Sequence, residues 1–111
     1  MKIRLIEPAP PSVHLMSPWR YPRLGLPMVG AALAAAGHDV RIYCQQLAPV
    51  DWDDVRSAEL VGFSTTTSTA PAAYRMADLL RGRGIPVVIG GSHVTFMADE
   101  ALGHAGYVAR G

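Results

Sequence analysis

Hydrophobic and polar positions along this chain switch between the two-residue period of strands and the 3.6-residue period of helices. Short apolar runs predict strands, and longer segments with apolar residues three or four positions apart predict helices. The predicted strands are Lys2–Glu7, Asp39–Cys44, Leu60–Ser64, Pro86–Ile89 and Tyr107–Ala109. The predicted helices are Leu24–Ala36, Asp51–Ala58, Thr69–Arg83 and Thr95–Leu102.

The first predicted helix is rich in alanine and glycine, which is typical of a helix that packs closely on a sheet or a ligand. Its periodicity places Leu26, Val29, Leu33 and Ala36 on one buried face, and Gly37 is suited to end it.

Strands that alternate with helices predict an α/β fold around a parallel sheet. We expect one domain over residues 1–111, a Rossmann-like or flavodoxin-like three-layer structure with five strands in the order 2-1-3-4-5. The Pro8–Pro22 loop and the loops after Ser64 and Ile89 then converge on the carboxyl edge of the sheet. The last strand runs into Gly111 with no helix after it, so we expect an N-terminal fragment of a longer protein.

Composition excludes several classes of function. The net charge of +1 gives no electrostatic reason to expect nucleic acid or an anionic membrane as partner. The single cysteine, Cys44, excludes an internal disulfide, a CxxC zinc site and a cysteine-ligated iron–sulfur cluster within these residues; we expect it to be a buried structural thiol. The sequence holds neither a signal peptide nor a membrane-spanning stretch, which favours the cytoplasm.

The most informative segment is a buried strand that ends in two glycines. Val87–Ile89 is followed by Gly90 and Gly91, and then by Ser92, His93 and Val94. Paired glycines at the carboxyl end of a strand let a ligand approach the backbone closely, and open α/β sheets bind ligands at that end. The alternative is a tight turn with a capping serine.

The strand before it ends in six hydroxyl-bearing residues: Ser64, Thr65, Thr66, Thr67, Ser68 and Thr69. One hydroxyl is enough to cap the helix that follows, and Ser68 or Thr69 is suited to that role. The remaining hydroxyls lie beside a helix N-terminus, which favours anions. Together with the glycine loop they predict a site for a phosphate-bearing or nucleotide-like ligand.

Other polar residues give weaker signals. We expect His93 to donate or accept hydrogen bonds at the site, and no histidine has the spacing of a zinc ligand. Asp51, Asp53 and Asp54 are predicted to form a solvated helix face. No acid/base pair, nucleophile elbow or phosphate loop is present, so the chain is predicted to be a binding module without catalytic residues.

Two motifs in this order, Leu60–Thr66 and Val87–Thr95, resemble the N-terminal cobalamin-binding domain of B12-dependent radical SAM enzymes. The flanking segments are also similar to that family: Leu26–Asp39, Tyr74–Gly84, Ala98–Leu102 and Tyr107-Val108. The resemblance implies a Rossmann-like fold in which the nucleotide tail of cobalamin lies along the carboxyl ends of the strands. It also implies that Ser64, Thr66 and residues 90–93 belong to the two binding loops.

Two family features are absent from this chain. The DxHxxG motif, which supplies a histidine ligand to cobalamin in mutases and methionine synthase, does not follow the first strand. The resemblance therefore implies cobalamin held without a histidine ligand. The CxxxCxxC motif is also absent, so the [4Fe-4S] cluster and S-adenosylmethionine would be bound by a separate radical SAM barrel in the parent methyltransferase or cyclase.

Other functions remain open on sequence grounds. Leu33–Arg41 resembles the first helix and second strand of nucleotide-sugar glycosyltransferases, whose N-terminal half is Rossmann-like. A scaffold domain that has lost cobalamin binding is a second alternative. A receiver domain fits poorly, because Glu7 is the only acidic residue after the first strand and Ser64 stands where an aspartate is needed.

Overall fold

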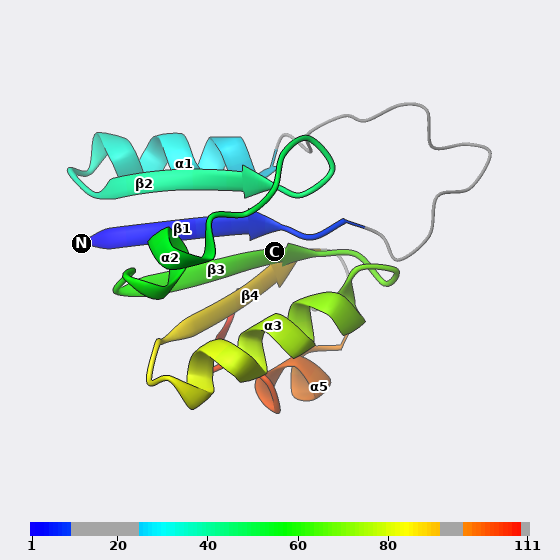
Figure 1. Ribbon diagram of the computed structural model, residues 1–111. Coiled ribbons are helices and arrows are strands. Elements are labelled where there is room, and N and C mark those ends of the chain that lie inside the picture. Colours follow the sequence, from blue (N-terminus) through cyan, green and yellow to red (C-terminus); the bar gives the residue numbers. More distant parts are fainter. Residues whose placement is uncertain (10–24, 92–96, 110–111) are drawn as a thin grey trace.

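We describe a computed structural model of the chain for residues 1–9, 25–91 and 97–109. Five strands and four helices alternate along this part of the chain (Figure 1). The strands are β1 (Lys2–Glu7), β2 (Asp39–Cys44), β3 (Leu60–Thr65), β4 (Val87–Gly91) and β5 (Tyr107–Val108). The helices are α1 (Gly25–Ala35), α2 (Trp52–Arg56), α3 (Ala70–Gly82) and α5 (Ala98–Leu102).

All five strands pair in parallel, in the order β2-β1-β3-β4-β5. This confirms the predicted α/β fold and strand order. In register, Ile3 of β1 faces Val40 of β2 on one side and Leu60 of β3 on the other. β2 lies on one side of β1 and β3 on the other, so the order of the strands reverses at β1. The carboxyl ends of β1 and β3 flank this topological switch point, where open α/β sheets bind ligands.

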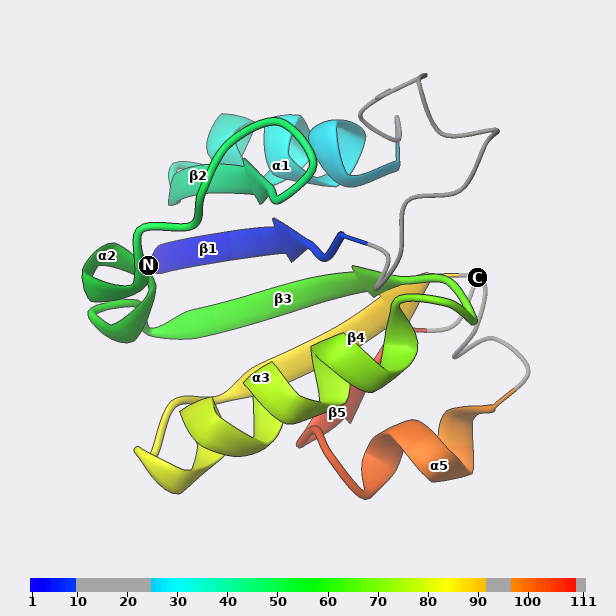
Figure 2. The same ribbon diagram turned by 45° about the vertical axis from the view of Figure 1, so that its right-hand side comes forward.

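Helices cover both faces of the sheet, which gives the predicted three layers. Figures 1 and 2 show α1 on one face and α2 and α3 on the other, with α5 beside α3. The larger core lies under α2, α3 and α5 and includes Val61, Ile89 and Leu80. The smaller core lies under α1 and includes Leu5 and Leu26.

The buried face of α1 differs from the predicted one. Of the four predicted residues only Leu26 is buried. Leu33 is half-buried, Val29 is 50% exposed, and Ala36 is exposed just beyond the end of the helix. Gly30 faces the sheet in place of Val29. A Cβ added to Gly30 would lie 2.6 Å from Cδ1 of Ile42. The helix therefore approaches β2 through a glycine, a contact that hydrophobic periodicity does not reveal.

The prediction that Asp54 belongs to a solvated face is wrong. Its carboxylate accepts hydrogen bonds from Nε of Arg4 (2.6 Å) and from the hydroxyl of Tyr43 (2.6 Å). The Arg4 side chain is only 3% exposed, and it also contacts Asp39 on β2. The hydrogen bond from Arg4 holds the pKa of Asp54 well below its usual range. This network fixes α2 against β1 and β2.

Candidate functional site

The carboxyl ends of β3 and β4 lie side by side and form the candidate site. β3 extends through Thr65 and β4 through Gly91, so both strands are longer than predicted. Ser64 is paired with Gly90, and Thr65 with Gly91. The hydroxyl loop (residues 64–69) and the first two residues of the glycine loop (residues 90–94) therefore meet at one edge, as the sequence indicated.

The fold requires a glycine at position 91, whether or not a ligand is bound. Its φ of +107° is in the region that favours glycine, and a Cβ there would lie 2.3 Å from the carbonyl oxygen of Thr65 and 2.6 Å from its nitrogen. Gly90 differs, because its added Cβ would meet Ala109 at an ordinary 3.4 Å. The close approach expected of a ligand at Gly91 is thus made by the backbone of β3.

The side chain of Thr65 ties the two strand ends together. Thr65 is fully buried, and its hydroxyl donates a 3.0 Å hydrogen bond to the carbonyl oxygen of Gly90. This bond satisfies a carbonyl at the end of β4 and orients the backbone at Gly90. Thr65 therefore positions Gly90 and Gly91 from within the core.

Three further hydroxyls bond mainly to one another. Oγ1 of Thr66 lies 3.1 Å from Oγ of Ser68 and 3.3 Å from Oγ1 of Thr69. Thr69 is the N-cap residue of α3, but its hydroxyl accepts a hydrogen bond from the backbone N–H of Thr66 (2.9 Å) and makes no hydrogen bond that caps the helix. The loop is therefore built as a turn that is closed by its own side chains.

Ser64 and Thr67 complete the row of hydroxyl-bearing residues. Ser64 is half-buried on the face that β3 presents to the α1 side of the sheet, next to Gly90, while Thr67 is exposed at the tip of the loop. Three predicted site residues, Ser92, His93 and Val94, lie outside the described residues, as does most of the Pro8–Pro22 loop. The structure thus brings together the hydroxyl loop, Gly90 and Gly91.

Sequence reasoning missed a polar cluster between α3 and α5. The imidazole of His104 stacks on the ring of Tyr74 with 4.3 Å between centroids, and its Nδ1 lies 2.9 Å from a carboxylate oxygen of Asp78. The Tyr74 hydroxyl donates to Glu100 at 3.0 Å. Burial, with a smaller contribution from Glu100, raises the pKa of Tyr74 to about 12. These residues are far apart in sequence, and no local motif marks them.

The described part of the chain carries no candidate cluster of metal ligands. Within residues 1–9, 25–91 and 97–109, no three histidine, cysteine or acidic side chains are grouped so that they could hold a metal ion. Cys44 is half-buried with a free thiol, not fully buried as expected. The edge offers neutral hydroxyls and bare backbone, which suit hydrogen bonding to a ligand.

The chain matches a known family of domains over most of its length. A family model described as the B12 binding domain matches residues 17–111, most of the chain and both strand-end loops. The chain belongs to the B12-binding domain family. The family's cofactor and the parallel sheet with its carboxyl-edge loops agree with the resemblance seen in the two sequence motifs.

Three curated relatives of this B12-binding domain are, by their names, two methyltransferases and a cyclase. Bacteriochlorophyllide d C-8(2)-methyltransferase of Chlorobaculum tepidum is 42% identical over 48% of this chain and 12% of its own length. Bacteriochlorophyllide d C-12(1)-methyltransferase of the same organism is 34% identical over 79% of this chain and 19% of its own. Anaerobic magnesium-protoporphyrin IX monomethyl ester cyclase of Synechocystis sp. is 29% identical over 92% of this chain and 23% of its own.

The B12-binding domain therefore spans less than a quarter of the length of each of these relatives. No solved structure matches the chain significantly. Across the described residues, none of the helices has the length and apolar character needed to cross a membrane.

Proposed function

We propose that this chain is the cobalamin-binding domain of a B12-dependent radical SAM enzyme of the methyltransferase or cyclase type. Residues 1–111 would form a single domain in the N-terminal part of a longer, cytoplasmic protein. The family match over residues 17–111 carries this proposal. The names of the relatives, two methyltransferases and a cyclase, support the type of parent enzyme.

The residues at the carboxyl edge suit cobalamin chemically. Its nucleotide tail carries a phosphate, and the corrin carries amide groups, so hydroxyls and backbone groups are matching partners. We assign hydrogen bonding to Ser64, Thr66 and Thr67, and close backbone contact to Gly90. Thr65 and Gly91 position this edge, because the Thr65 hydroxyl bonds to Gly90 and Gly91 packs against the Thr65 backbone, which joins β3 to β4.

The glycine loop beyond Gly91 completes the proposed site. Ser92, His93 and Val94 keep the roles that their motif implies, with His93 as a hydrogen-bonding group. Since the DxHxxG motif is absent after β1, we infer that the chain holds cobalamin without supplying a histidine to its cobalt. Cobalamin supplies methyl-transfer or redox chemistry when bound, and the protein orients it.

The rest of the chemistry belongs to the proposed parent protein. The [4Fe-4S] cluster and S-adenosylmethionine would be bound by a radical SAM barrel outside these residues. This chain would hold the corrin so that it lies between its own strand ends and that barrel. The glycosyltransferase alternative has no comparable support, because the matching family binds B12.

The proposal is tested by titrating the purified chain with hydroxocobalamin and methylcobalamin, followed by visible absorption. We expect a saturable spectral change that Ser64→Ala and Thr67→Ala weaken. Ser57→Ala is the matched control, because it removes a hydroxyl at the C-cap of α2, near the amino ends of the strands. If the three alanine variants bind alike, the assignment of the edge is wrong.

The parent protein provides the second arm of the test. A site shared with a barrel would be incomplete in the isolated domain, so the same titration is repeated on the longer protein. Binding by the parent and not by the isolated domain would support a shared site. The absence of binding by both would refute the cobalamin proposal.

A further inference from the structure

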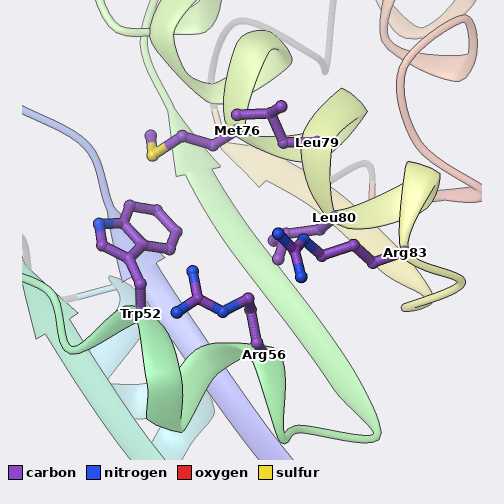
Figure 3. Close-up of a pocket in the computed structure, with 6 residues that line it drawn as sticks. All are labelled: Trp52, Arg56, Met76, Leu79, Leu80 and Arg83. Atoms are coloured by element: carbon purple, nitrogen blue, oxygen red, sulfur yellow. The ribbon is translucent and has the colours of Figure 1, made fainter.

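A second concave surface lies between α2 and α3, on the face opposite α1. It is a groove of about 280 Å³ lined by Trp52, Arg56, Met76, Leu79, Leu80 and Arg83. Figure 3 shows the indole of Trp52 and the guanidinium group of Arg56 rising from α2, and Arg83 reaching from the end of α3 back toward α2. The lining therefore combines apolar side chains with two guanidinium groups.

The groove is separate from the candidate cobalamin site. α2 lies beside the amino ends of β1 and β3, whereas the hydroxyl loop follows the carboxyl end of β3, and Gly90 and Gly91 form the carboxyl end of β4 (Figures 1 and 2). A groove of this volume is just below the range of about 300–1,000 Å³ in which drug-sized ligands are enclosed. It is thus too small for a corrin, and suits a ligand with a short apolar body.

The charges around the groove favour an anion. None of the six lining residues is acidic. Arg56 pairs with Asp53 on its own helix, an aspartate whose side chain is 91% exposed, so this pair is screened by water. Among the described residues Arg83 makes no ion pair. A guanidinium group has five N–H donors, so both arginines retain donors for a second partner.

The apolar part of the lining is unusually exposed for such large side chains. Leu79 is 72% exposed, and Trp52 and Met76 are only partly buried where they pack against the core. Covering these side chains with an aliphatic or aromatic body would remove apolar surface from water, which favours binding. Trp52 also provides a face on which an aromatic ring can stack.

We propose that the α2–α3 groove binds a small organic anion, with an apolar body over Trp52, Met76 and Leu79 and a carboxylate or phosphate head between Arg56 and Arg83. The inference does not depend on cobalamin binding, because the two sites lie at opposite ends of the sheet. A neutral ligand of the same shape should bind more weakly, since it forms no charge-assisted hydrogen bonds with the guanidinium groups.

The test uses the fluorescence of Trp52 in a Trp19→Phe background, which removes the only other tryptophan. The probes are octanoate, octyl phosphate and 1-octanol, each below its aggregation concentration. We expect saturable binding of at least one anion, and at least roughly tenfold weaker binding of the alcohol. The ratio of the two anion affinities identifies the preferred head group.

Two arginine variants locate the interaction. Arg83→Gln should weaken anion binding several-fold, and Arg81→Gln should leave it unchanged, because Arg81 is an exposed arginine in the last turn of α3 that does not line the groove. Circular dichroism checks that both variants fold. Equal affinity for alcohol and anions, equal effects of the two variants, or no saturation by any probe would overturn the proposal. If no probe binds saturably, a polypeptide becomes the candidate occupant of the groove.

Discussion

Gly91 gives the sharpest structural prediction, because Gly90 beside it is a built-in control. Gly91→Ala places a methyl group at a φ of +107° and 2.3 Å from the carbonyl oxygen of Thr65, whereas Gly90→Ala meets only Ala109 at 3.4 Å. The obstacle at Gly91 is the backbone of a central strand, which cannot move aside as the end of a flexible side chain can.

The expected magnitude follows from two costs and one effect that partly offsets them. An L-residue in a left-handed conformation costs about 1–2 kcal/mol, and forcing an extra methyl group into packed structure costs about 1–3 kcal/mol. Alanine also lowers the conformational entropy of the unfolded chain, which stabilises the fold by about 0.4–1 kcal/mol and partly offsets these costs. We therefore expect Gly91→Ala to lower the free energy of unfolding by about 2–4 kcal/mol, and Gly90→Ala to change it by less than about 1 kcal/mol.

Urea unfolding followed by circular dichroism measures both variants. A difference of 2 kcal/mol corresponds to a fall in melting temperature of roughly 8 °C or more for a domain near this size. If the two variants unfold within about 0.5 kcal/mol of each other, which is the usual range for surface substitutions, the contact between Gly91 and Thr65 is not what fixes this strand end.

Three further predictions concern the core and its polar groups. Thr65→Val leaves the carbonyl of Gly90 without its 3.0 Å hydrogen bond and should cost about 1–3 kcal/mol in urea unfolding. Asp54→Asn leaves the buried Arg4 without its charged partner and should lower the free energy of unfolding by about 3–5 kcal/mol, whereas Arg4→Met combined with Asp54→Leu should recover most of that stability. Because the pKa of Asp54 is lowered in the folded state, the Arg4–Asp54 pair should stabilise the fold fully above about pH 4. Its contribution should weaken as the pH falls further, which acid unfolding would show. The raised pKa of Tyr74, about 12 against 10.0, means that stability is unaffected below pH 10 and falls by about 2–3 kcal/mol between pH 10 and 12, a loss that Tyr74→Phe should abolish.

The fold was predictable because its signals are local. The range of β2 was predicted correctly, and α3 was predicted to within one residue at each end from four apolar positions at helical spacing. The strand order then followed from the way parallel strands with crossover helices are connected. The error on α1 has a specific cause: Gly30 lies against Ile42, and a glycine carries no hydrophobic signal.

Residues that act through distant partners were not predictable in this way. Asp54 looks like a solvated helix residue until β1 and β2 bring Arg4 and Tyr43 beside it. At the candidate site, the meeting of the hydroxyl and glycine loops was predicted, because both follow neighbouring strands. The separate roles of these residues were not predicted, because only the structure shows that Thr65 contacts Gly90 and Gly91 while Ser64 lies at the edge.

The central claim is that cobalamin binds at the carboxyl ends of β3 and β4. The most direct measurement is a ¹⁵N–¹H correlation spectrum of the 111-residue chain, recorded with and without hydroxocobalamin. We expect the amide signals of residues 64–67 and of Gly90 and Gly91 to shift, and those of Trp52 and Arg83 at the α2–α3 groove to stay unchanged. An unchanged spectrum of both the chain and its parent, or shifts confined to the groove, would contradict it.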